Sequence, residues 1–300
     1  MTFDNTAAEQ RVAPSIYLAP AFLAIAVLLW GTSFMATKTA LSGFAPSTMV
    51  WLRMTIATLM ILPMARRIPK PDYRPGDWKI LGFLCLMQPC LYFLLESNAV
   101  NLTTSSQAGM LSCLVPLLVA AGAWIILREP MTRNILLGLA ASMAGVVWLS
   151  LAGAPDADAP NPALGNLLEV AALTCAAVYM VVMKQLSTRY STWWLTGLQC
   201  LAGAVFFLPG GILAAPADWS AIPLRAWLGV GYLGGFVTLG AFGLYNMALT
   251  MMPAGRAALS INMVPPVALV AGWLLLGESL TPGQMAACCV VGLGVWIGRR

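Results

Sequence analysis

The chain repeats its own landmarks at a fixed spacing, and this restricts the folds open to it. Residues 101–148 and 250–297 align without a gap at an offset of 149 positions. The coinciding residues are Val115 and Pro116 with Val264 and Pro265, Trp124 with Trp273, Leu127 and Glu129 with Leu276 and Glu278, Thr132 with Thr281, and Gly145 with Gly294. Further landmarks upstream follow at offsets of 149 and 146, so the sequence predicts two equivalent halves.

The composition excludes a soluble globular protein. Hydrophobic residues make up 60% of the chain and charged residues only 9%, too few to cover the surface of a soluble domain of 300 residues. About twenty apolar residues cross the roughly 30 Å hydrocarbon core of a bilayer as a helix. We therefore expect an all-α integral membrane protein. Pro, Gly and charge clusters divide the chain into ten predicted transmembrane helices, at residues 18–38, 46–65, 78–100, 103–127, 133–152, 165–184, 193–213, 226–248, 254–276 and 281–298.

Five helices in each half require opposite orientations of the two halves. An odd number of spans carries the chain across the bilayer, so the second copy begins on the opposite face from the first. We predict two inverted five-helix repeats around a central cavity, at residues 18–152 and 165–300. A linker at 153–164 joins them, and a cytoplasmic segment at 1–17 precedes them.

The basic residues favour one orientation of this arrangement. With both termini in the cytoplasm, 13 of the 16 Lys and Arg residues fall on the cytoplasmic side. Lys38 and Arg225 fall on the outer side, and Arg53 lies within a span. Because cytoplasmic loops retain positive charge, we expect both termini to be cytoplasmic.

Prolines fall near the middle of three predicted spans. Pro89, Pro116 and the pair Pro265 and Pro266 each remove a backbone donor and free a carbonyl, which in hydrocarbon needs a neighbour or a wet cavity. Such residues either make kinks that only improve packing or border a cavity. We prefer the cavity, because the breaks coincide in depth in equivalent helices. Nearby polar and aromatic side chains give the candidate substrate contacts Trp30, Ser33, Gln88, Tyr92, Ser112, Tyr179, Tyr245, Ser260 and Asn262.

Three charged residues lie inside predicted spans, all in the outer half of the bilayer. Arg53 shares its depth with Glu96 and Glu169, which suggests an ion pair between Arg53 and one of these carboxylates. Independent snorkelling to the outer surface is the alternative. Either carboxylate is also a candidate proton carrier. Glu129 and Glu278, by contrast, are interpreted as turn elements that start the following span.

The residue inventory argues against catalysis. The chain contains no histidine, the usual zinc ligand and the usual catalytic base, and no aspartate lies within a predicted span. We expect no metal, no cofactor and no enzymatic activity. An intramembrane enzyme and a channel are the alternatives to a carrier, and single-channel currents would favour the channel.

Several short motifs occur together along the chain: Trp30, Gly31 and Phe34; Leu52 and Arg53; Val115, Pro116 and Leu117; Trp124, Arg128 and Glu129; Val264, Pro265 and Pro266; and Trp273, Gly277, Glu278, Leu280 and Thr281. In these motifs the whole chain resembles the drug/metabolite transporter superfamily, specifically its EamA-type ten-helix exporters. The resemblance implies a basket of helices one, three, four, six, eight and nine around the cavity, with five and ten outside. The sixth helix departs from the pattern, because Ala176 and Ala177 stand where the first helix has Trp30 and Gly31.

The predicted function is therefore export of small amphipathic metabolites across the bacterial inner membrane by alternating access. The resemblance favours neutral or aromatic amino acids as substrates, and a multidrug exporter of cationic amphiphiles is the alternative. The expected partners are a small-molecule substrate and the lipid bilayer, with no nucleic acid. One chain contains both repeats, so a monomer suffices for this prediction, and the oligomeric state stays open.

Overall fold

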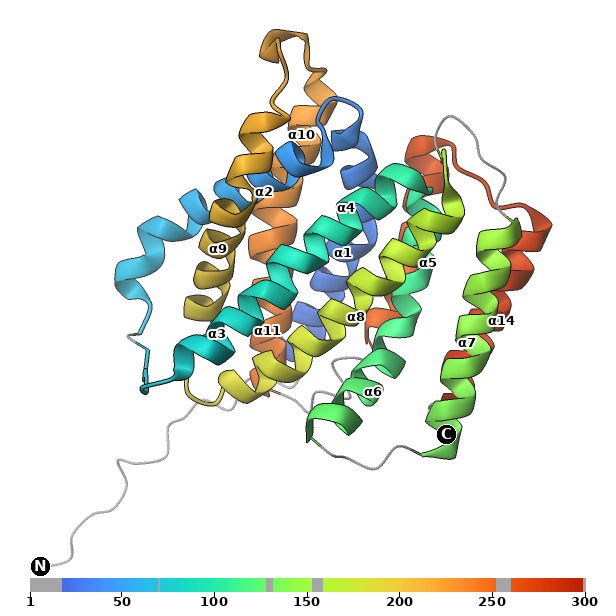
Figure 1. Cartoon of the computed structure of the whole chain (residues 1–300), viewed down its shortest axis with the longest axis horizontal. Coiled ribbons are helices and arrows are strands. Elements are labelled where there is room, and N and C mark those ends of the chain that lie inside the picture. Colours follow the sequence, from blue (N-terminus) through green and yellow to red (C-terminus); the bar gives the residue numbers. More distant parts are fainter. Residues whose placement is uncertain (1–17, 70, 128–131, 153–158, 252–259, 299–300) are drawn as a thin grey trace, which may run out of the picture.

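The computed structural model describes residues 18–69, 71–127, 132–152, 159–251 and 260–298, and this part of the chain is helical without a strand (Figure 1). The predicted cytoplasmic segment at 1–17 and half of the predicted linker lie outside the described residues. The α-helices are α1 (Leu18–Leu41), α2 (Pro46–Ile61), α3 (Asp77–Cys85), α4 (Tyr92–Leu102), α5 (Ser105–Leu111), α6 (Val115–Leu127), α7 (Arg133–Ala152), α8 (Pro162–Leu186), α9 (Thr192–Leu213), α10 (Leu224–Tyr232), α11 (Phe242–Met251), α13 (Val264–Ala271) and α14 (Pro282–Gly298). Short 3₁₀ or π-helical segments extend them, at Leu62–Arg67, Leu86–Leu91, Ser112–Leu114, Trp219–Ala221, Leu233–Ala241, Ile261–Met263 and Gly272–Leu276.

These pieces join into long apolar helices. In the described residues seven are long and apolar enough to cross a membrane, namely Leu18–Leu41, Pro46–Arg67, Asp77–Leu102, Ser105–Gly122, Pro162–Leu186, Thr192–Leu213 and Leu224–Ala248. Three shorter apolar helices, Arg133–Leu149, Ile261–Leu276 and Pro282–Gly298, fall on the remaining predicted spans. The all-helical membrane fold predicted from the composition is therefore confirmed.

The outer surface of the bundle is as apolar as its interior. Large aliphatic side chains project from the bundle, and Leu213 and Leu151 are 88% and 79% exposed. Exposed aliphatic surface on this scale is unfavourable in water and fits contact with lipid tails. Polar groups are instead gathered inside, where Arg53, Glu96 and Glu169 are buried.

Helices α7 and α14 pack along each other as a pair at one side of the bundle (Figure 1). They run antiparallel, since Gly138 near the start of α7 meets the backbone of Gly294 and Gly298 near the end of α14. Gly145, further along α7, faces Val291 and Ala287. The absence of side chains at these glycines lets the two backbones approach closely.

Helix interruptions occupy equivalent places in the two parts of the chain. The π-helical segment Leu86–Leu91 contains Pro89 after an extended Gln88 (φ −146°, ψ 121°), and the segment Leu233–Ala241 covers the positions 149 residues later. The 3₁₀ turns Ser112–Leu114 and Ile261–Met263 are related by the same offset and contact each other. Single π-helical turns of this kind are frequent at functional sites.

The prolines at two of these sites start helices. Pro116 and Pro265 each follow a 3₁₀ turn as the second residue of α6 and α13, and Pro266 follows directly. The N–H groups in the first turn of a helix have no acceptor within that helix, so a proline there costs no helical hydrogen bond. The predicted helix breaks are thus present at these two sites. The 3₁₀ turns interrupt the α-helix, and the prolines lie in the first turn of the α-helix that follows.

Candidate functional site

A cavity of about 50 Å³ lies between α1, α4, α8 and the interrupted segments. Five of the nine predicted substrate contacts line it: Trp30, Ser33, Gln88, Tyr92 and Ser112. Apolar side chains complete the wall, among them Phe242, Ile261 and Val264. The volume holds a few water molecules and lies well below the several hundred Å³ of a typical ligand pocket.

The polar groups of the wall divide into satisfied and unsatisfied atoms. Ser33 Oγ donates to the carbonyl of Trp30 at 2.7 Å, and Ser112 Oγ donates to the carbonyl of Gly109 at 2.6 Å. Trp30 Nε1 and Gln88 Oε1 are buried and have no hydrogen-bond partner within the described part of the chain. A buried donor and a buried acceptor without partners are costly unless a ligand or water supplies them.

Aromatic rings hold Trp30 in place from behind. The Trp30 ring lies 5.3 Å from the Phe242 ring and 4.8 Å from the Tyr245 ring, centroid to centroid. Tyr179 packs against Phe242 and donates its hydroxyl to Asn246 Oδ1 at 3.2 Å. Tyr179 and Tyr245 do not line this cavity, and their rings pack behind Phe242 and Trp30, so their predicted contact with substrate stays a prediction.

The remaining two predicted contacts lie on the helix restart in the second half. Ser260 and Asn262 flank Ile261 at the start of the 3₁₀ turn, and of these three residues only Ile261 lines the cavity. A 3₁₀ turn has about three residues per turn, so neighbours along it point in different directions. Ser260 and Asn262 therefore adjoin a residue of the cavity wall without lining the cavity, and their contact with substrate stays a prediction.

A second, smaller cavity of about 20 Å³ lies on the other side of Gln88 and Phe242. Its wall includes Pro89, Gln199 and Thr238. Gln199 Nε2 donates to the backbone carbonyl of Gln88 at 2.8 Å, which satisfies a group exposed by the break in the helix. Gln88 and Phe242 thus separate two small spaces in the centre of the bundle.

Arg53 is fully enclosed beside this second cavity. Its Nη1 lies 3.8 Å from Glu96 Oε2, and both side chains are 2% exposed. Its Nε donates to Thr238 Oγ1 at 2.6 Å, and its guanidinium stands 4.1 Å from the centroid of the Phe93 ring. The ion pair hypothesised from shared depth is present with Glu96, and burial of Arg53 excludes snorkelling to the outer surface.

Thr238 and Gln199 were not predicted as site residues. Thr238 lies in the π-helical segment of the eighth span, 149 residues after Pro89. The repeat offset could therefore have identified this position as a second helix interruption. No comparable sequence signal identifies Gln199, because its hydrogen bond to the Gln88 carbonyl depends on how α9 packs against the segment Leu86–Leu91.

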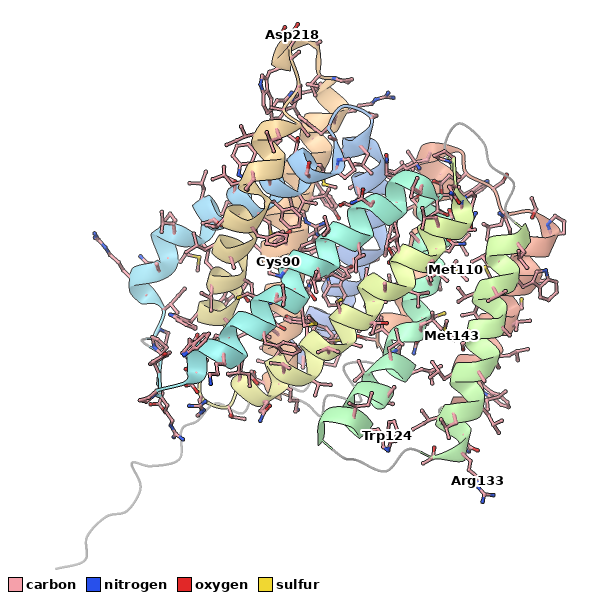
Figure 2. All side chains as sticks on the ribbon, viewed as in Figure 1. Cys90, Met110, Trp124, Arg133, Met143 and Asp218 are labelled. Carbon is pink, nitrogen blue, oxygen red and sulfur yellow. The ribbon has the colours of Figure 1, made fainter. Side chains whose placement is uncertain are left out.

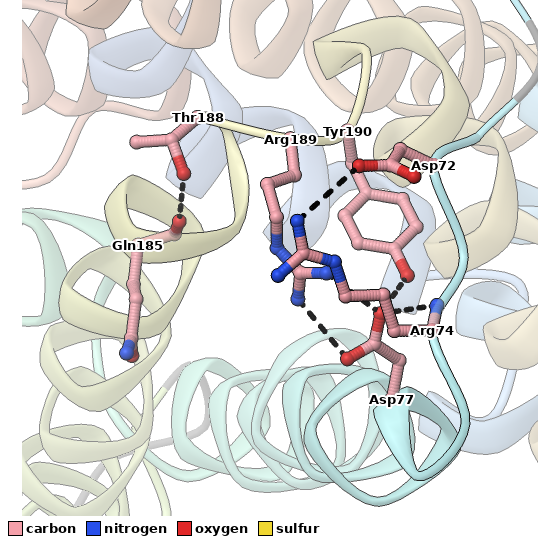
Figure 3. A network of polar contacts seen from close by, with 7 residues as sticks. All are labelled: Asp72, Arg74, Asp77, Gln185, Thr188, Arg189 and Tyr190. Carbon is pink, nitrogen blue, oxygen red and sulfur yellow. Dashed lines mark hydrogen bonds and ion pairs between the residues drawn. The ribbon is translucent and has the colours of Figure 1, made fainter.

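A polar network surrounds Asp77 (Figure 3). Arg189 donates to both carboxylate oxygens of Asp77, at 3.0 and 3.1 Å, and Tyr190 donates to Asp77 Oδ2 at 2.5 Å. The backbone N–H of Arg74 also donates to Asp77. Burial and the neighbouring Asp77 carboxylate raise the pKa of Tyr190 to about 12, so its hydroxyl remains a donor. The network ties the start of α3 to the turn between α8 and α9.

An aromatic cluster joins the equivalent elements elsewhere in the bundle. The Phe44 ring, after α1, lies 5.0 Å from the Trp227 ring of α10, and the Trp219 ring lies 5.9 Å from the Trp227 ring at a tilt of 33°. Ala226 stands 149 residues after Asp77, and Phe44 stands 146 residues before Tyr190. Figure 2 places Asp218, the neighbour of Trp219, at the opposite end of the molecule from Arg133.

Glu278 lies in the turn between Leu276 and the start of α14, where the sequence places a helix-terminus and turn element. It accepts hydrogen bonds from the backbone N–H groups of Ser105 and Ser106 at 2.9 and 2.8 Å, and from both hydroxyls. A carboxylate at a helix N-terminus satisfies free N–H groups and interacts favourably with the helix dipole. From this turn Glu278 caps α5, a contact that the sequence did not predict. Glu129 lies outside the described residues.

Comparison with known proteins identifies relatives over almost the entire chain. The model of the EamA-like transporter family matches residues 18–151 and 163–298. The uncharacterised transporter YetK of Bacillus subtilis is 27% identical, with 92% of this chain and 84% of YetK aligned. A probable terminal-alkyne amino-acid exporter of Streptantibioticus cattleyicolor is 24% identical over 93% of this chain and 92% of its own. An S-adenosylmethionine/S-adenosylhomocysteine transporter of Chlamydia trachomatis is 26% identical over 89% of this chain and 84% of its own.

Proposed function

This chain belongs to the EamA-like transporter family, and from that premise we propose that it exports small amphipathic metabolites, with neutral or aromatic amino acids as the substrate class. The family is one of transporters and is not an enzyme class. Two relatives support the substrate class, one named as an amino-acid exporter and one as a transporter of S-adenosylmethionine and S-adenosylhomocysteine, which both carry an α-amino acid group.

One observation supports an amino acid in particular. The central cavity presents one unpaired donor, Trp30 Nε1, and one unpaired acceptor, Gln88 Oε1. A zwitterion carries a carboxylate that accepts hydrogen bonds and an ammonium that donates them, so it satisfies both atoms. The rings of Trp30 and Phe242 offer an apolar surface to its side chain. The hydroxyls of Ser33 and Ser112 already donate to the backbone and would act as acceptors.

The proposed mechanism is alternating access around this cavity. The polar network at Asp77 would close the cytoplasmic end, and the aromatic cluster at Phe44 would close the outer end. Both closures link residues before 153 to residues after 163, so opening either one separates the two halves at that end. The cavity of about 50 Å³ is too small for an amino acid, so binding requires one closure to open.

The geometry of α7 and α14 supports two inverted five-helix repeats. Gly138 faces Gly294, which is the equivalent of Gly145, and Gly145 faces Ala287, which is the equivalent of Gly138. Ser142 Oγ donates to the carbonyl of Val291, its own equivalent, at 3.1 Å. Reciprocal contacts of this kind are the signature of a two-fold axis.

Because α7 and α14 run antiparallel, that axis lies perpendicular to them and inverts one half relative to the other. We therefore propose ten spans, with repeats at 18–152 and 165–300, both termini in the cytoplasm, and a location in the bacterial inner membrane. The separate family matches at 18–151 and 163–298 support these boundaries.

Counterflow in proteoliposomes tests the substrate class. Vesicles loaded with unlabelled L-phenylalanine should take up external labelled L-phenylalanine transiently above equilibrium, and Trp30→Ala or Gln88→Leu should lower the initial rate at least about tenfold, the effect of losing roughly 1.4 kcal/mol of binding. Trp124→Ala is the matched control, since Trp124 is 50% exposed on the outer surface. Unchanged counterflow in both cavity variants would remove these residues from the site. Counterflow of amphipathic cations alone would favour the multidrug alternative.

A further inference from the structure

Glu169 stands out among the buried polar groups. It lies two turns into α8 and is completely buried. Neither of its carboxyl oxygens has a hydrogen-bond partner among the residues that the structure describes. Buried carboxyl groups are normally paired or hydrogen-bonded, and ionisable side chains at membrane depth are typically functional.

Its ionisable neighbours come mainly from one helix. Glu96 and Tyr92 of α4 interact electrostatically with Glu169, and Arg53 of α2 joins them through Glu96. The other ionisable side chains on α8 itself and on the described helices packed against it are Asp77, Lys79, Cys85, Cys90, Cys113, Arg133, Cys175, Tyr179 and Lys184. Asp77, at the start of α3, carries a negative charge itself and is bound by Arg189 and Tyr190, so it offers Glu169 no countercharge.

The charges of this cluster do not balance. Arg53 Nη1 already forms an ion pair with Glu96 Oε2 at 3.8 Å, and the Arg53 side chain also contacts Thr238 and Phe93. A second carboxylate would leave one negative charge in excess in an apolar interior. A proton on Glu169 removes that excess, because the neutral carboxyl group needs no countercharge.

We propose that Glu169 is the proton-carrying group that couples this transporter to a proton gradient, with one proton moving inward for each solute exported. This proposal rests on the transport function proposed above. In the outward-open state the Glu169 carboxylate takes a proton from water. In the inward-open state the O–H bond breaks, the proton passes to cytoplasmic water, and the solute then enters the cavity.

The position of Glu169 connects it to the central cavity. Leu173 and Ala176 lie one and two turns further along the same face of α8, and both line that cavity. Tyr92 also lines the cavity, and its hydroxyl donates to Glu96 Oε1 at 3.3 Å. The carboxyl pair therefore adjoins the space that would open alternately to the two sides.

Solute accumulation against a pH gradient tests the coupling. Proteoliposomes with an acidic lumen, an alkaline exterior and a membrane potential held at zero with valinomycin and equal potassium should accumulate labelled L-phenylalanine. One-for-one exchange sets the limit at about tenfold for each pH unit. Glu169→Gln should abolish accumulation while retaining counterflow at equal pH, and Glu169→Asp should restore accumulation at least in part. Glu278→Gln is the matched control, because it removes a carboxylate from a helix cap away from the cluster.

Two results would overturn the proposal. One is accumulation by Glu169→Gln equal to that of the wild-type protein, and the other is wild-type accumulation that ignores the pH gradient. If Glu169→Gln also loses counterflow, the result for Glu169→Asp tests the proposal instead. A monodisperse Glu169→Asp protein that shows counterflow but no accumulation contradicts the proposal.

A measurement without substrate separates this proposal from the proposed function. Infrared spectra of the purified wild-type protein should contain the C=O band of a buried protonated carboxyl group that titrates with pH, and Glu169→Gln should lack it. If the wild-type protein shows this band but no phenylalanine counterflow, the substrate class fails and the proton site stands. Absence of the band from the wild-type protein overturns the proton site whatever the transport result.

Discussion

Arg53 shows how a charged side chain is accommodated inside a helical bundle. Its guanidinium combines an ion pair with Glu96, a hydrogen bond to Thr238 and a face contact with Phe93. Each contact replaces part of the hydration that burial removes. The group on α2 is thus held by α4 and by the segment Leu233–Ala241, and it links the three elements to one another.

Removing one partner of this ion pair should destabilise the protein more than removing both. Arg53→Met leaves Glu96 buried without its countercharge, and the expected loss is about 3–5 kcal/mol. The double variant Arg53→Met with Glu96→Gln should recover much of it. Thermal and denaturant unfolding of the purified protein in detergent, arranged as a double-mutant cycle, measures the coupling. Strictly additive losses would contradict a direct interaction between the two side chains.

At the scale of single residues, the sequence predicted which residue types lie near the cavity better than it predicted which face of a helix each residue occupies. Trp30, Ser33, Gln88, Tyr92 and Ser112 were found because aromatic and polar residues are conspicuous near helix breaks in an apolar chain. Depth along a helix can be counted at 1.5 Å per residue. The face of the helix toward the cavity depends on local twist, and the 3₁₀ turn Ile261–Met263 changes that twist, so the faces of Ser260 and Asn262 could not be counted in the same way.

Among the elements, the α7–α14 pair depends most directly on small residues. The backbone of Gly294 lies against Ser142 and Gly138, where an added methyl group meets backbone atoms that cannot move aside. Gly292, one half-turn earlier on the same helix, has open space around it. Two glycines in one helix therefore differ in what they contribute.

Gly294→Ala should separate α7 from α14 and lower the free energy of unfolding by about 1–3 kcal/mol, the usual cost of overpacking. Gly292→Ala is the matched control and should be neutral or stabilise the helix by about 0.5–1 kcal/mol, because alanine is the better helix former. Unfolding midpoints of the two variants in the same detergent make the comparison. Equal effects of the two substitutions would show that the contact at Gly294 is not close.

The order of the elements could be predicted from the sequence, whereas their interruptions could be located only approximately. Apolar length and charge placement identify each span, because lipid requires long helices. The π-helical segment Leu233–Ala241 was not predicted, since it contains no proline, the residue that indicated the other breaks. Equivalence with Leu86–Leu91 by the repeat offset is the signal that sequence reasoning left unused.

For the molecule as a whole, the two clusters proposed to close its ends differ in their chemistry. The network at Asp77 is made of charges and hydroxyls, and the cluster at Phe44 is made of aromatic rings. Sequence analysis did not predict the Asp77 network, because Asp77 and Arg189 are 112 residues apart and lie at the ends of predicted spans.

Asp77→Asn should favour opening of the end closed by Arg189 and Tyr190, because the amide cannot accept both hydrogen bonds of the guanidinium with full charge. A cysteine at Ala176, which lines the cavity, reports on this opening in a protein otherwise free of cysteine. A membrane-impermeant maleimide applied from the cytoplasmic side should label it severalfold faster in the variant. Asp72→Asn is the matched control, since Asp72 forms a solvent-exposed pair with Arg74 and makes no hydrogen bond to Arg189 or Tyr190 within the described residues. Equal labelling rates would mean that the network does not hold this end closed.

The reciprocal glycine contacts between α7 and α14 also bear on how such a chain could arise. A helix surface that packs against its equivalent in the other half is self-complementary. Two separate polypeptides of half the length would therefore already carry both surfaces of the α7–α14 interface. Duplication and fusion of one such gene then need no new interface, only a connecting peptide that crosses no membrane. Afterwards each copy is free to diverge, and one entrance can acquire charges while its counterpart retains aromatic rings.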